Sequence, residues 1–153
     1  MADIEFANAL LAAARPDDDW SDPLVSSIVS GRLSRDAIRR YAIGIATISA
    51  AFPRRIAQIL AICDVAVVRE SLIANLLEEE GVTAWEPGAA LRVVREKSHA
   101  ALARRFARAA GASDAEIDTA LSASRNARWF ENAIERGDWL GAFAYVSVGH
   151  EAN

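Results

Sequence analysis

The sequence predicts an all-α protein, a bundle of closely packed helices. Of the 153 residues, 52% are hydrophobic and only four are proline. Alanine and leucine, which are abundant here, favour helices. No segment alternates polar and apolar residues over a useful length, as a half-buried strand would. The length suits one hydrophobic core, so residues 1–153 are predicted to form a single helical domain.

Three helices are predicted in the first part of the chain. Two are short, over residues 3–14 and 23–30, and Gly31 is suited to end the second. Ser34 is a good N-cap for a long third helix, which Pro53 either kinks or divides in two. The inward face of this helix is predicted to carry Ile38, Tyr41, Ala42, Ile45, Ile48 and Phe52.

Capping signals also define the later helices. Asp64 is predicted to cap a helix over residues 65–80, and a loop is predicted over residues 82–88. Ser98 is predicted to cap the next helix, which Gly111 ends.

A capping box begins the following helix, because Ser113 and Glu116 have the required spacing. Further helices are predicted at about residues 114–122 and 125–136. Asp138 is predicted to cap a last helix that begins at Trp139.

Three polar residues are expected where these helices should bury apolar stripes. At about 100° per residue, Glu79 falls within about 20° of Leu72. His99 shares a face with Leu102 and Phe106. Glu151 extends the line Leu140, Phe143, Ala144 and Ser147.

This placement suggests chemistry at Glu79, His99 and Glu151. An isolated buried carboxylate is costly, so it needs a partner, a raised pKa or a metal. Two carboxylates and an imidazole that point inward from three helices are typical of half of a non-haem iron site. Glu96 and His150 are secondary candidates, because Glu96 has the E-x-x-H spacing to His99 and His150 adjoins Glu151.

Each of the three main candidates also has an ordinary interpretation. An acidic run such as Glu78-Glu79-Glu80 at a helix end is commonly a solvated terminus. A histidine in a first helical turn often caps the helix or faces water. Glu151 is also explained as an exposed residue at a fraying helix end.

Composition narrows the class of protein. The net charge of −4 gives no general attraction to nucleic acid. The single cysteine, Cys63, follows an apolar run and is predicted to be a small buried residue. The N-terminal segment lacks a basic signal-peptide region, and the uncharged run Tyr41–Pro53 is too short for a bilayer, so a cytoplasmic protein without membrane contact is expected.

Several motifs, in this order, resemble the haem-oxygenase-like helical bundle superfamily of TenA/PqqC type. They are Asp22-Pro23-Leu24, SGRLSRDAIRRYA (30–42) and FPRRIAQILAIC (52–63). NLLEEEG (75–81) and SHAALARRFARAAG (98–111) resemble the segments where its di-iron members place a first Glu and a first His. GHEA (149–152) resembles the segment with the second Glu. The resemblance implies that the chain is the N-terminal two-thirds of such a bundle, without its C-terminal helices.

This resemblance implies a non-haem di-iron oxidase or oxygenase that uses O2 to oxidise a small organic molecule. It makes Glu79, His99 and Glu151 iron ligands, with two Fe(II) ions in the complete site and no haem. Apolar walls that keep water from the reaction are expected to include Tyr41, Phe52 and Phe143.

Two other functions remain open at this stage. One is a metal-free enzyme, like the pyrroloquinoline-quinone synthase or thiaminase-II-type members of the superfamily, whose acids and histidine transfer protons. The other is a non-catalytic half-bundle that pairs with another chain. Either a homodimer or a partner chain that completes the bundle is expected.

Overall fold

The computed structural model describes residues 26–27, 30–84, 88, 90–123 and 128–151, and for 83–84 and 147–151 it describes the backbone alone. These residues form mainly helices, which confirms the all-α prediction. Contacts divide the chain into Met1–Ala37 and Ile38–Asn153. The elements described below lie in the second unit, except that the longest helix begins at the end of the first unit. The predicted helix at residues 3–14 and most of that at 23–30 lie outside the described residues.

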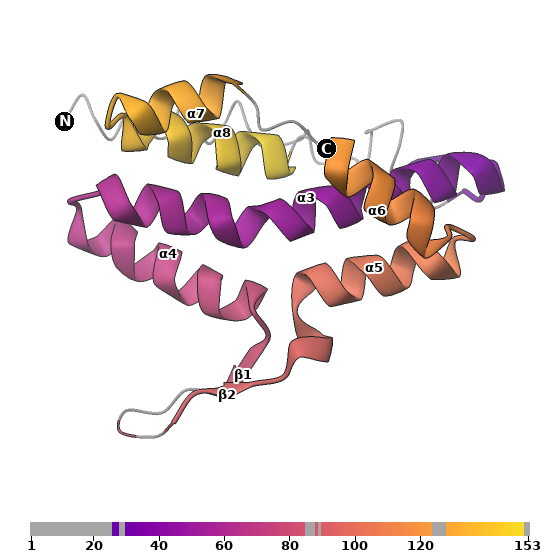
Figure 1. The fold of residues 1–153 in the computed structure, drawn as a ribbon, viewed down its shortest axis with the longest axis horizontal. Helices are drawn as coiled ribbons and strands as arrows, with labels where there is room; N and C mark the ends of the chain where they lie inside the picture. The colour runs from indigo at the N-terminus through magenta and orange to yellow at the C-terminus, as the bar shows by residue number, and fades with distance from the viewer. Residues whose placement is uncertain (1–25, 28–29, 85–87, 89, 124–127, 152–153) are drawn as a thin grey trace. The chain divides into compact units, whose positions relative to one another are not determined.

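The longest element is α3 (Arg35–Ile62), one helix that continues through Pro53. Its beginning agrees with the prediction, because the Ala37 N–H donates to Ser34 Oγ at 3.1 Å. A tight connection leads to α4 (Ala66–Glu79), which runs back beside the second half of α3 (Figure 1).

The predicted cap at Asp64 is wrong. Val65 occupies the N-cap position of α4, and no side chain caps this helix end. Arg69 instead fastens the connection, because its guanidinium donates to the carbonyl groups of Leu60 and Cys63 near the end of α3. Cys63 is buried, as the sequence predicted.

A small hairpin follows α4 where the sequence predicted only a loop. Strands β1 (Val82–Ala84) and β2 (Arg92–Val93) pair antiparallel, with Val82 opposite Val93. These strands are too short for an alternating pattern to reveal them. The predicted loop is therefore wrong at Val82–Ala84, where a short strand forms, while the chain as described stays mainly helical.

The short 3-10 helix η1 (Arg95–Lys97) leads from the hairpin into α5 (His99–Ala109). Ser98 caps α5 as predicted, because its Oγ accepts from the Ala101 N–H at 3.2 Å. The next helix, α6 (Asp114–Ala123), begins at the predicted capping box: Glu116 accepts from the Ser113 N–H at 2.9 Å.

The last two helices, α7 (Arg128–Glu135) and α8 (Trp139–Glu151), form an antiparallel pair (Figure 1). Asp138 caps α8 as predicted, since its carboxylate accepts from the Gly141 N–H at 2.8 Å. The guanidinium of Arg55 lies 5.4 Å from the ring centroid of Tyr145, which joins α3 to α8 by a cation–π contact.

Two buried clusters form the core of the described residues. The large-residue cluster joins α3, α4, α7 and α8, and the alanine cluster joins α3, α5 and α6. The first contains Phe52, Ile56, Ile59, Cys63, Leu72, Phe130, Ala133, Ala142 and Val146. The second contains Ala42, Ala46, Ala103, Ala107, Ala112 and Ile117.

By length and composition alone, α3 is long and apolar enough to cross a membrane. Core helices of soluble proteins meet the same criterion, and α3 contributes buried residues to both clusters. The absence of membrane contact therefore stays a prediction.

Candidate functional site

Glu79 is the one charged residue that is buried in the described part of the chain, with 4% of its surface exposed. It lies at the last turn of α4, two turns after the buried Leu72, so the helical period places both on the inward face. The predicted inward position of Glu79 is therefore confirmed.

His99 provides the partner that a buried carboxylate requires. Its Nδ1 lies 2.7 Å from Glu79 Oε1, although the two residues are twenty positions apart in the sequence. His99 is the first residue of α5, so the Ser98 cap fixes where its side chain begins. Its side chain is 40% exposed, whereas that of Glu79 is 5% exposed.

The hydrogen bond between them determines the chemistry that this pair can perform. When Glu79 is ionised, its carboxylate only accepts hydrogen bonds, and Nδ1 of His99 then carries the proton and donates it to Oε1. In the neutral imidazole, Nε2 then keeps its lone pair and can accept a proton or bind a metal ion. The pair thus combines a carboxylate and an oriented imidazole.

A pocket of about 530 Å³ adjoins Glu79. Its walls come from α3, α4 and the start of α5, and most of them are small or apolar. Arg54 is the one cation among the lining residues, which are Ala50, Pro53, Arg54, Ala57, Leu76, Glu79, Glu80, Ser98 and Ala100. Sequence reasoning missed this face of α3, because only the tertiary packing of α4 and α5 encloses it.

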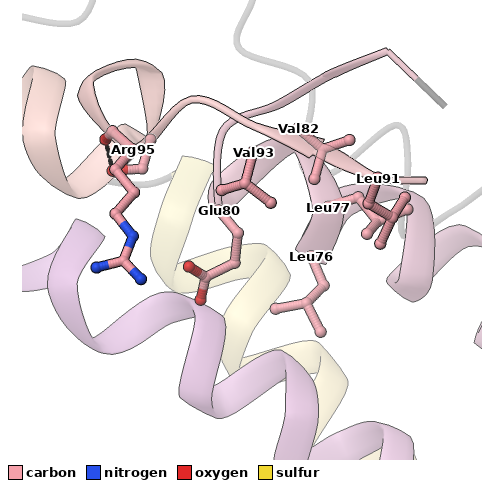
Figure 2. A pocket seen from close by; sticks show the side chains of 8 residues that line it. Leu76, Leu77, Glu80, Val82, Leu91, Val93 and Arg95 are labelled. Carbon is pink, nitrogen blue, oxygen red and sulfur yellow. Dashed lines mark hydrogen bonds between the residues drawn. The ribbon is translucent and has the colours of Figure 1, made fainter.

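A second pocket, of about 540 Å³, lies between the end of α4 and the hairpin (Figure 2). It shares Leu76, Glu80 and Ser98 with the first pocket, so the two adjoin. Leucine and valine side chains form most of its lining, with Glu80 and Arg95 as the charged residues.

The predicted pocket residues lie elsewhere. Phe52 is buried in the large-residue cluster and Phe143 packs against it. Tyr41 makes an edge-to-face contact with Phe106, with ring centroids 6.5 Å apart. None of these three predicted residues lines the pocket beside Glu79.

The predicted inward faces of α5 and α8 are also wrong. Leu102 and Phe106 are 41% and 42% exposed, and α5 instead buries Ala103 and Ala107. In α8, Leu140 is 61% exposed, and the buried residues are Ala142 and Val146.

Among the other candidates, only Glu96 has a described side chain, and it does not extend the pair. Glu96 is exposed on η1. The backbone of α8 reaches His150 and Glu151, but their side chains lie outside the described residues, so their role as ligands stays a prediction. No group of three or more His, Cys, Asp or Glu side chains is gathered as a metal site within the described ranges.

As metal ligands, Glu79 and His99 fit part of a non-haem iron site, because such iron is bound by carboxylate and imidazole groups. Two protein ligands are fewer than a stable iron centre needs. In comparisons with protein-family models, characterised proteins and solved structures, the chain has no significant match.

Proposed function

We propose that this chain forms the iron-binding part of a non-haem oxidase or oxygenase with a haem-oxygenase-like bundle. The observation that supports this most is the buried Glu79, hydrogen-bonded to His99 at 2.7 Å beside a pocket. A buried carboxylate that meets an imidazole from another helix is an uncommon and costly arrangement, which favours a functional role.

In this proposal His99 binds Fe(II) through Nε2, and Glu79 supplies a carboxylate oxygen or orients the imidazole. Glu151 is the proposed third ligand, and the complete site holds two ions with further ligands. Bound iron would supply the electrons that activate O2 for oxidation of a small organic substrate. The apolar and small side chains around Glu79 would hold that substrate and limit the access of water.

Assembly with a second copy or a partner chain forms part of the proposal. Trp129 on α7 and Leu140 on α8 are 49% and 61% exposed, which supports a contact on this helix pair. Solution mass measured with and without iron tests whether a second chain takes part in the site.

The direct test is Fe(II) binding by the full chain under argon, followed by O2 consumption. Glu79→Ala and His99→Ala are each expected to lower iron affinity by about tenfold or more. Glu78→Ala is the matched control, because it removes an exposed carboxylate from the adjacent position of α4. The proposal is wrong if the wild-type chain, with any second subunit it requires, neither binds iron nor consumes O2.

A metal-free acid–base enzyme is the second candidate, and the same hydrogen bond favours it. Glu79 would orient His99, and Nε2 would transfer protons to and from a substrate in the pocket. Iron stoichiometry separates the two functions. If the metal-free protein is catalytically active, the acid–base enzyme is supported and the iron-dependent function is contradicted.

A further inference from the structure

The turn between α4 and β1 makes an unusually close backbone contact at Gly81. This residue has a φ of +81°, in the left-handed region. A Cβ atom placed on it would lie 2.5 Å from the Val94 carbonyl oxygen and 2.8 Å from the Ser98 backbone nitrogen. Both distances are shorter than real Cβ atoms accept, and both neighbours are backbone atoms that cannot simply rotate away.

This contact lies at the junction that brings the two candidate ligands together. Gly81 follows Glu79 by two residues, and Ser98 directly precedes His99. The Val94 N–H donates to the Gly81 carbonyl at 3.0 Å, which fastens the returning strand to the end of α4.

The start of α5 is fixed from the same point. The Ser98 N–H donates to the Arg95 carbonyl at 3.1 Å, and Ser98 then caps α5. The end of α4 and the start of α5 are therefore connected through the few atoms around Gly81.

We propose that Gly81 is a positioning residue: the absence of its side chain lets α4 and α5 approach until Glu79 reaches His99. A methyl group at this position would push the Ser98 backbone away, and the hydrogen bond between Nδ1 and Oε1 would lengthen or break. The consequence for metal binding rests on the proposed function, whereas the consequence for the hydrogen bond does not.

Gly111 provides a matched control. It also has a left-handed backbone, with a φ of +92°, but nothing lies within 4 Å of a Cβ placed there. Gly81→Ala and Gly111→Ala therefore share the backbone strain, and the close contact belongs to Gly81 alone. Asparagine tolerates a positive φ better than alanine, so Gly81→Asn and Gly111→Asn repeat the comparison if the alanine variant fails to fold.

The test measures the His99 ring by nitrogen-15 NMR in the full chain, with His99→Gln to assign the signals. In the wild type we expect a protonated Nδ1 whose proton exchanges slowly with water, since it is hydrogen-bonded to Glu79. Gly81→Ala should lose this signal, as Glu79→Ala should because it removes the acceptor, while Gly111→Ala keeps it. Thermal unfolding confirms that each variant is folded.

Fe(II) affinity under argon is the second readout. We expect it to fall about tenfold or more in Gly81→Ala and to stay near the wild-type value in Gly111→Ala. If Gly81→Ala loses the ring signal and the wild-type chain keeps it but binds no iron, the positioning role is supported and the proposed function is contradicted. A folded Gly81 variant that keeps the ring signal, or a wild type without it, would overturn the inference.

Discussion

The two core clusters differ in the size of the side chains that they bury. The large-residue cluster has phenylalanine and isoleucine at its centre, with Phe130 only 2% exposed and Ile56 fully buried. The alanine cluster has five alanines and one isoleucine, Ile117. One helix, α3, contributes to both, with alanines in its first half and larger residues after Phe52.

This difference indicates two ways of holding helices together. Large side chains remove much apolar surface from water, and their stabilisation scales with that area. Alanines bury little area, but they let helix backbones approach closely. Glu79 lies on α4, which contributes to the first cluster, and His99 lies on α5, which contributes to the second. The pair therefore connects helices from the two kinds of core.

The largest expected effect on stability comes from a substitution in the large-residue cluster. Phe130→Ala should lower the free energy of unfolding by about 3–5 kcal/mol, because it removes a buried ring and leaves a cavity. Denaturant unfolding measures the change. Trp129→Ala is the control, because Trp129 is the adjacent aromatic residue and is 49% exposed. An equal loss in both variants would contradict the assignment of Phe130 to the core.

In the alanine cluster we expect a smaller loss of stability, which comes from overpacking and not from a cavity. Ala107→Leu should cost about 1–3 kcal/mol, because a fully buried alanine between close helices leaves no space for three more carbon atoms. Ala109→Leu, at an exposed position of α5, should change stability little. Equal unfolding midpoints for the two variants would show that the cluster is loosely packed.

The smallest expected effect is a pH dependence of stability that comes from Glu116 on α6, which contributes to the alanine cluster. Hydrogen bonds from the backbone and side chain of Ser113, and then the charge of Arg39, hold the pKa of Glu116 below its ordinary value of 4.5. A lowered folded-state pKa means that this stabilisation is present above about pH 4.5 and is lost as pH falls through the folded pKa.

Melting temperatures between pH 3 and pH 7 measure this contribution. The melting temperature of the wild type should be higher than that of Glu116→Gln near neutral pH, and this difference should become smaller in acid. Glu135→Gln, on an exposed residue of α7, is the control. A difference between wild type and Glu116→Gln that stays constant with pH would show that Glu116 acts through its shape and not its charge.

Local chemistry was readable from the sequence. Ser34, Ser98, Ser113 and Asp138 begin helices as predicted, because a cap bonds to backbone groups only a few residues away. The inward position of Glu79 was also predictable, since α4 keeps one period from Leu72 to its end. Asp64 shows the limit of this reasoning: a suitable cap residue stands next to the helix, but Val65 occupies the N-cap position.

Tertiary structure decided which faces are buried and which residues meet. The spacing of apolar residues along α5 and α8 is compatible with more than one inward face, because alanine occurs both in cores and at surfaces. Packing selected Ala103, Ala107, Ala142 and Val146 in place of the larger residues that sequence reasoning chose. Sequence alone thus determined the helices and the inward Glu79. The 2.7 Å contact with His99 depends on a close backbone approach at Gly81 between segments that no local pattern relates.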